Sequence, residues 1–215
     1  MTTDEILDEL MLMFPNARCE LNHKNPFELA VSVALSAQTT DIAVNKVTPD
    51  LFKKYPTPKD MAQADIKDLE SHLRSIGLYR NKAKNIKGMA KMLYEEYDSK
   101  MPDKMEELIK LPGIGRKSAN VILSVAFNIP AIAVDTHVQR VAKRLGLAYK
   151  NDDVYKVEMK LNKKIKKEKW NIAHHLFIFF GRYKCKAQRP ECEGCPFIEF
   201  CKYQKKRWKY KLHRF

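Results

Sequence analysis

The fold of this chain is decided by the stretch Leu111-Pro112-Gly113-Ile114-Gly115-Arg116-Lys117. Apolar residues recur at helical spacing before and after it, which predicts a helix on each side. Pro112 ends the first helix, while Gly113 and Gly115 permit a tight turn and let another molecule approach the backbone closely. The free N–H groups that begin the second helix favour anions such as phosphate. A lone Pro-Gly turn is usually a plain connector, but two spaced glycines followed by Arg116 and Lys117 predict a helix-hairpin-helix that grips a nucleic-acid backbone.

Helical periodicity continues over the rest of the chain. Thr2 and Glu5 have the spacing of a capping box at the start of a first helix. No segment keeps a two-residue alternation with turn signals at both ends, so the sequence predicts an all-α protein. Further helices are expected from 26 to about 36, from 39 or 40 to about 55, at 60–63, 65–74, 81–97 and 103–110, from 136 to about 144, and at 153–167 and 170–180.

The net charge of +14 is concentrated near the C-terminus, where residues 160–215 hold 17 Lys and Arg against 4 Asp and Glu. Such a field attracts polyanions, although a lysine-rich surface that only confers solubility is the simpler alternative. The N-terminus has no targeting signal, and no apolar run reaches membrane-spanning length. We therefore expect a cytoplasmic, monomeric protein whose cysteines are reduced.

Four of the five cysteines lie close together in the sequence and leave Cys19 alone as a packed or idle thiol. Their spacing is C-x6-C-x2-C-x5-C within 17 residues, at Cys185, Cys192, Cys195 and Cys201. In a reducing compartment, clustered thiols bind metal far more often than they form disulfides. Thiolates suit zinc as well as an iron–sulfur cluster, and the spacing alone does not choose between the two. Neighbouring basic residues would balance a thiolate centre: Arg182, Lys184, Lys186 and Arg189.

Together, three motifs make this chain resemble the endonuclease III family, within the helix-hairpin-helix superfamily of DNA glycosylases. They are the hairpin at 111–117, the segment 134–137 with Asp135 placed 18 residues after Lys117, and the cysteine spacing. Shorter matches extend the resemblance over almost the whole chain, at 25–29, 35–41 and 76–79.

The resemblance implies two helical domains that flank a DNA-binding groove. One is a six-helix domain at residues 22–132, which contains the hairpin. The other joins residues 1–21 to 133–215 and holds a [4Fe-4S] cluster, rather than zinc, in the loop 185–201. The implied partner is double-stranded DNA with damaged bases or abasic sites, which places the protein at the nucleoid.

Lys117 and Asp135 are the predicted catalytic residues. Removal of a damaged base requires extrusion of its nucleotide, because the glycosidic carbon is unreachable inside a duplex. Lys117 lies in the first turn of a helix beside Arg116, and both surroundings favour the neutral, nucleophilic amine. Asp135 is an anion that can stabilise positive charge on the sugar; on its own it is more simply a helix N-cap, and the two roles are compatible.

The remaining site residues are predicted as DNA contacts. The resemblance places Gln38 and Leu78 where the family fills the gap left by the extruded base; a capping amide and a buried loop anchor are the plainer alternatives. The hairpin and the basic cluster loop would hold phosphates, through Gly113, Gly115, Arg116, Lys184 and Lys186. The roles of His137 and Asp41 are left open.

Three functions compete at this point. The favoured one is a bifunctional base excision repair glycosylase that removes oxidised pyrimidines through a lysine Schiff base and then nicks the strand on the 3′ side of the abasic site as an AP lyase. The second is a monofunctional glycosylase of the same fold, for instance one that removes mismatched adenine; such relatives generally lack lysine at the position of Lys117. The third is a non-catalytic DNA-binding iron–sulfur protein. The sequence does not disclose the preferred bases, the relative strength of the two reaction steps, or any redox role of the cluster.

Overall fold

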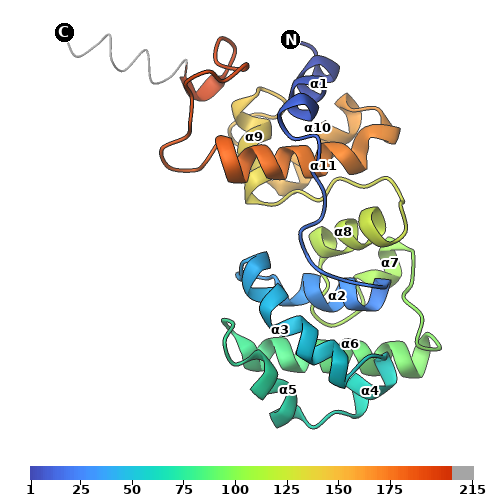
Figure 1. The fold of residues 1–215 in the computed structure, drawn as a ribbon. Helices are drawn as coiled ribbons and strands as arrows, with labels where there is room; N and C mark the ends of the chain where they lie inside the picture. The colour runs from blue at the N-terminus through green and yellow to red at the C-terminus, as the bar shows by residue number, and fades with distance from the viewer. Residues whose placement is uncertain (205–215) are drawn as a thin grey trace. The chain divides into compact units, whose positions relative to one another are not determined.

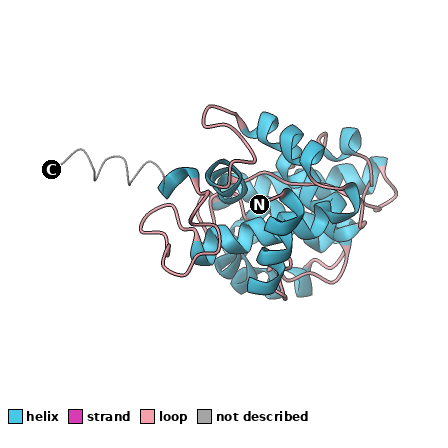
Figure 2. Ribbon diagram, turned by 90° about the horizontal axis from the view of Figure 1, so that it is seen from above, coloured by secondary structure: helices cyan, strands magenta, loops and turns pink. Residues whose placement is uncertain are grey.

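The computed structural model describes residues 1–204. Within them the regular secondary structure is all helical, with connecting loops and no strand (Figure 2). The predicted all-α class is therefore confirmed. The chain divides into two compact units. One is Glu20–Ile129, which we call the hairpin unit, and the other joins Met1–Cys19 to the described part of Pro130–Phe215, which we call the cysteine unit.

The hairpin unit is built around α2, which lies between α8 and α6 (Figure 1). Nine of the ten residues of α2 are buried. A helix that is apolar all round belongs in a core, and α2 packs against α3, α6 and α8. The α4 and α5 helices pack on α6. The helices of this unit are α2 (Pro26–Leu35), α3 (Asp41–Lys54), α4 (Pro58–Gln63), α5 (Ile66–Leu73), α6 (Tyr79–Glu96), α7 (Met105–Leu108) and α8 (Arg116–Ala126).

Side-chain caps fix where several of these helices begin. Asn25 accepts a hydrogen bond from the backbone N–H of Glu28 at 2.9 Å, and Thr40, rather than Thr39, caps α3. The predicted helix 81–97 begins earlier, at Tyr79, without a side-chain cap. The predicted helix 103–110 is shortened to the single turn of α7, because the chain bends into the hairpin directly after it.

The cysteine unit contains the first helix of the chain and everything described after Pro130. The capping box of Thr2 and Glu5 is confirmed, with bonds of 2.7 and 3.2 Å in the two directions. An ion pair between Lys169 and Asp4 at 2.8 Å adds to the packing of α1 on α11. The elements are α1 (Thr3–Met13), α9 (Thr136–Arg144), α10 (Val154–Lys164), η1 (Lys167–Lys169), α11 (Trp170–Phe179) and η2 (Phe180–Lys184).

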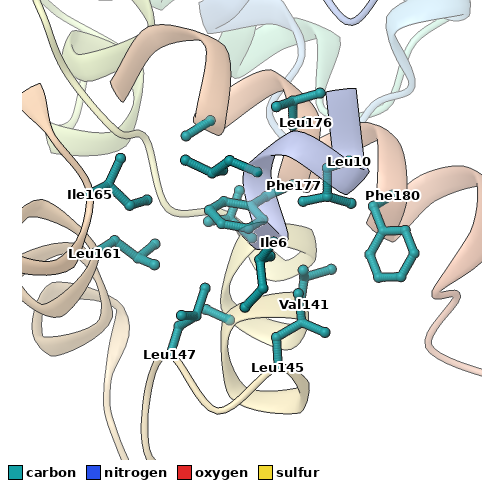
Figure 3. Packing of buried hydrophobic residues seen from close by; sticks show 14 of the residues in the cluster. Ile6, Leu10, Val141, Leu145, Leu147, Leu161, Ile165, Leu176, Phe177 and Phe180 are labelled. Atoms are coloured by element: carbon teal, nitrogen blue, oxygen red, sulfur yellow. The ribbon is translucent and has the colours of Figure 1, made fainter. Parts of the chain in front are cut away.

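One apolar cluster holds the cysteine unit together (Figure 3). Ile6 and Leu10 of α1 lie against Phe177 and Phe180 from the far end of the chain, so the N-terminal helix is part of this core. Fully burying a side chain of this size stabilises a fold by about 1.5–3 kcal/mol. The cluster therefore joins segments that are more than a hundred residues apart in sequence.

Two predicted helix ends in this unit are wrong. The helix predicted at 153–167 ends at Lys164, and a separate 3-10 turn follows at Lys167–Lys169. The helix predicted to stop at 180 continues as a π-helix over Phe180–Lys184, in which the N–H of Cys185 bonds the carbonyl of Phe180 at 2.6 Å. Among the described helices, none has the length and apolar character needed to span a bilayer.

Candidate functional site

The hairpin between α7 and α8 is anchored by two buried side chains. Leu111 is 1% exposed and Ile114 5% exposed, and the N–H of Ile114 bonds the carbonyl of Leu111 at 3.0 Å. Gly113 has a φ of +83°, and a Cβ there would lie 3.0 Å from the Cβ of Asn85. The turn therefore requires glycine at 113 for both its backbone conformation and its packing.

Gly115 has a different role in the turn. It is the N-cap of α8 with a φ of −99°, and no side chain caps the helix. A Cβ at Gly115 would meet no protein atom within 4 Å, so the backbone is open to an approaching molecule there. Arg116 and Lys117 follow directly and are exposed. An uncapped helix start with two adjacent cations is suited to a phosphate group.

The two predicted catalytic residues lie at the starts of two helices. Lys117 is exposed in the first turn of α8. Asp135 is the half-buried N-cap of α9, and its Oδ1 accepts a hydrogen bond from the N–H of Val138 at 2.8 Å. The plainer expectation for Asp135, a helix cap, is thus met, while its second oxygen is not used by that bond. Lys117 belongs to the hairpin unit and Asp135 to the cysteine unit.

Gln38 and Leu78 share an unusual backbone conformation. Their φ angles are +54° and +58°, in the left-handed region that side chains other than glycine rarely adopt. Both are exposed, Leu78 by 57%. This excludes the buried anchor considered for Leu78. Backbone strain of this kind persists only where the surrounding structure fixes the conformation, and both residues lie in the hairpin unit.

Lys82 was missed by the sequence reasoning. It is only 5% exposed, and burial lowers its pKa below the usual lysine value. Its Nζ donates a hydrogen bond to Oγ1 of Thr39 at 2.5 Å. Because Lys82 precedes Ala83 and Ile86 on the apolar stripe of α6, its position in that stripe was the available signal. An amine so deeply buried is not accessible to DNA, whereas the side chain of Lys117 is exposed.

The four clustered cysteines line one pocket. Its empty space, including the mouth, is about 360 Å³. Burial raises the pKa values of Cys185 and Cys195, while the hydrogen bond and the positive charge of Arg144 partly oppose the rise at Cys185. In residues 1–204, no group of three or more Cys, His, Asp or Glu side chains is arranged to hold a single metal ion.

Two arginines of α9 donate hydrogen bonds to the segment where the cysteine loop, residues 185–201, begins. Arg140 donates to the carbonyl oxygens of Gly181 at 2.7 Å and Cys185 at 3.1 Å. Arg144 donates to the carbonyl of Lys186 at 2.8 Å and to the Sγ of Cys185 at 3.2 Å. Its guanidinium also lies 4.1 Å from the ring centre of Tyr203. The i, i+4 spacing puts both arginines on one helix face, but nothing in the sequence links that face to Cys185.

Lys184 and Lys186, two of the basic residues near the cysteines, have partners close by in the sequence. The Nζ of Lys184 donates to the carbonyl of Glu193 at 3.2 Å, and the Nζ of Lys186 pairs with Glu191 at 2.6 Å. Lys186 is nevertheless exposed, while Lys184 is partly exposed. Their contact with phosphates stays a prediction.

His137 and Asp41 lie at the starts of helices. The Nδ1 of His137 is 3.2 Å from the Nη2 of Arg140, which gives the imidazole a structural partner. Asp41 follows Thr40, whose hydroxyl oxygen accepts a hydrogen bond from Ala43 at 3.2 Å. The cap of α3 is therefore the threonine, and Asp41 lies in the first turn.

Comparison with known proteins defines the class. Residues 31–167 match the family model of the HhH-GPD superfamily of base excision DNA repair proteins. Endonuclease III of Bacillus subtilis is 55% identical over 201 residues, which cover 94% of this chain and 92% of that protein. Endonuclease III of Escherichia coli is 41% identical over 202 residues, which cover 94% and 95% of the two chains. This chain belongs to the endonuclease III family.

Solved structures agree with that assignment. A trapped endonuclease III–DNA covalent intermediate is 55% identical with a TM-score of 0.92, covering 97% of this chain and 99% of the other. A thermostable thymine-DNA glycosylase is 21% identical with a TM-score of 0.82, covering 94% and 96%. At that identity the second likeness is one of fold alone.

Proposed function

We propose that this chain is a bifunctional DNA glycosylase and AP lyase of base excision repair. Its substrate is duplex DNA that carries oxidised or otherwise damaged pyrimidines, or abasic sites. The observation that carries the proposal is an exposed lysine, Lys117, in the first turn of a helix that follows an uncapped glycine turn, in a chain of the endonuclease III family. The proposal places the protein in the cytoplasm, at the nucleoid.

Lys117 is the proposed nucleophile. Its neutral amine attacks C1′ of the extruded nucleotide; the N–C1′ bond forms, the glycosidic bond breaks, and the base leaves with a proton. Opening of the sugar gives a protonated Schiff base. Loss of a C2′ proton then expels the 3′ phosphate and nicks the strand. A single lysine thus serves both steps. The covalent DNA intermediate trapped with an endonuclease III supports a reaction through a covalent bond between protein and DNA.

Asp135 is the proposed second catalytic residue. The bond from Val138 to its Oδ1 fixes the carboxylate in orientation and leaves the other oxygen for the reacting sugar. A fixed anion stabilises the positive charge that develops on the sugar ring without having to reorganise. Asp135→Asn keeps the cap oxygen and removes the charge, so it should lower excision while leaving α9 folded; Asp135→Ala should also lose about 1 kcal/mol of stability.

DNA contacts outside the two catalytic groups are proposed at five further places. The hairpin holds one phosphate through Gly113, Gly115 and Arg116, since its backbone is open and adjacent to cations. Gln38 and Leu78 enter the duplex where the nucleotide leaves, because both are exposed and held in strained turns. Lys184 and Lys186 of the cysteine loop add phosphate contacts.

The four cysteines are proposed to hold a [4Fe-4S] cluster. The donor set fits: four thiols line one pocket, Arg144 donates to the sulfur of Cys185, and Arg140 adds a second positive charge. When bound, the cluster would order the loop and its basic residues, because metal binding and folding are coupled. Iron and sulfide analysis of purified protein tests this; a colourless, zinc-containing protein contradicts it.

Borohydride trapping on a duplex with one abasic site tests the proposed chemistry. Wild-type protein should give a covalent adduct that Lys117→Gln does not form. Lys110→Gln, which removes an exposed lysine from the same hairpin, is the matched control and should trap normally. Base excision without any adduct would favour the monofunctional alternative. If wild-type protein shows neither excision nor an adduct, the non-catalytic DNA-binding alternative is favoured.

A further inference from the structure

We propose that Lys82 is a positioning residue that holds the turns of Gln38 and Leu78 in one arrangement. The inference rests on the proposed function in one respect, namely that these two turns meet DNA at the extruded nucleotide. Lys82 itself does not touch DNA, because its side chain is buried.

The geometry joins Lys82 to both turns. It lies on α6 one helical turn after Leu78, and its backbone N–H donates to the carbonyl of Leu78 at 3.0 Å. Its side chain reaches the other turn, where Nζ donates to Oγ1 of Thr39 at 2.5 Å. Thr39 directly follows Gln38, and its own N–H bonds the carbonyl of Ser36 at 3.1 Å. One residue is thus bonded to two turns that are about forty residues apart in sequence.

Energetics argue that this lysine is not present for stability. A buried ammonium loses its hydration, and a neutral hydroxyl such as that of Thr39 replaces only part of it. Even a buried ion pair, in which each charge is compensated, can often be replaced by apolar side chains of similar volume without loss of stability. A methionine at Lys82 would fill the same space against Ala83 and Ile86 without that penalty.

The backbone of the turns at Gln38 and Leu78 explains why a charged side chain is useful at Lys82. Each holds a residue other than glycine in the left-handed region, at φ values of +54° and +58°. Such strain lasts only where the surroundings fix the backbone. The Thr39 bond fixes the residue next to Gln38, and the same lysine ends the first helical turn of α6, directly after Leu78. Without the Thr39 bond, the turn at Gln38 is free to shift relative to the turn at Leu78.

Three variants separate positioning from folding. Lys82→Met removes the amine, Thr39→Val removes its acceptor, and Thr39→Ser keeps the acceptor. Lys84→Met is the matched control, since Lys84 is an exposed lysine of the same helix. Each variant is measured for unfolding in urea, for excision of a damaged pyrimidine, and for fluorescence of 2-aminopurine placed opposite the lesion, which reports opening of the base stack.

We expect Lys82→Met to be at least as stable as wild type, with excision about tenfold slower and a smaller 2-aminopurine signal. Thr39→Val should show the same two losses, together with lower stability, because it leaves the ammonium without an acceptor. The double variant should excise no more slowly than either single one. Thr39→Ser and Lys84→Met should behave as wild type.

Normal excision by Lys82→Met would overturn the inference, as would additive losses in the double variant or an excision defect that only follows lost stability. The proposed function fails separately: wild-type protein would then neither excise the pyrimidine nor form the borohydride adduct.

Discussion

Replacement of Gly115 by alanine should weaken DNA binding while leaving the protein folded. The backbone of Gly115, with φ −99° and ψ −180°, is open to any residue, and the added methyl group would meet no protein atom within 4 Å. Alanine reduces the conformational freedom of the unfolded chain, which raises the free energy of unfolding by about 0.4–1 kcal/mol. Alanine is also a poorer N-cap than glycine, which lowers the free energy of unfolding by a similar amount. The free energy of unfolding should therefore stay close to that of wild type.

DNA binding should change much more. The methyl group would stand between the hairpin backbone and a phosphate, and a hydrogen bond to a charged group contributes about 1.5–3 kcal/mol. Loss of one such bond raises the Kd by roughly 10- to 100-fold. Fluorescence anisotropy measures this Kd on a duplex with a stable abasic analogue, at one fixed salt concentration because phosphate contacts depend on salt.

Gly113→Ala is the control, since it adds the same methyl group to the same turn but at a position where the fold requires glycine. Its φ of +83° would cost an alanine about 1–2 kcal/mol. Its Cβ would also press on Asn85 at 3.0 Å. We expect this variant to lose stability in urea. If Gly115→Ala binds DNA as tightly as wild type, the phosphate role of the hairpin is refuted. If it is destabilised as much as Gly113→Ala, the account of Gly115 as an unstrained, open position is wrong.

Three further predictions concern Leu78, the cysteine loop and pH. Leu78→Gly should relieve about 1–2 kcal/mol of left-handed strain yet excise poorly, whereas Leu78→Ala should excise poorly without that gain; normal excision by both would contradict the proposed insertion of Leu78 into the duplex. Arg144→Lys keeps the charge but not the forked hydrogen bonds, so the proposed cluster should lose iron to a chelator roughly tenfold faster, while Lys143→Met should lose iron at the wild-type rate. Burial, together with a hydrogen bond to the carboxylate of Asp68, raises the pKa of Tyr55 to about 12 from an unfolded value of 10.0. Its contribution to stability is therefore full below pH 10 and is lost as pH rises toward 12, which urea unfolding at alkaline pH measures against Tyr55→Phe.

Local signals in the sequence predicted much of the fold. The capping box at Thr2, the proline and glycines of the hairpin, and the apolar periodicity of most helices act over a few residues, and the structure contains them where expected. Their physical causes are short-range hydrogen bonds and backbone preferences, which depend only on residues that are close in the sequence.

The missed features depend on contacts between distant segments. Arg144 bonds Lys186, 42 residues away, and Lys82 bonds Thr39, 43 residues away. The left-handed backbone of Leu78 is imposed by its surroundings, since leucine on its own avoids that conformation. The π-helix before Cys185 likewise has no signal in the residues that form it. Helical spacing placed Lys82 on the apolar stripe of α6, but its bonding partner Thr39 lies in a distant segment that the spacing does not identify.

Peptide mapping of the borohydride-trapped complex by mass spectrometry tests the central claim most directly. After nuclease and protease digestion, the sugar remnant should be found on the amine of Lys117 and nowhere else. A remnant on another amine, whether the N-terminus or a different lysine, would contradict the assignment of Lys117 as the nucleophile.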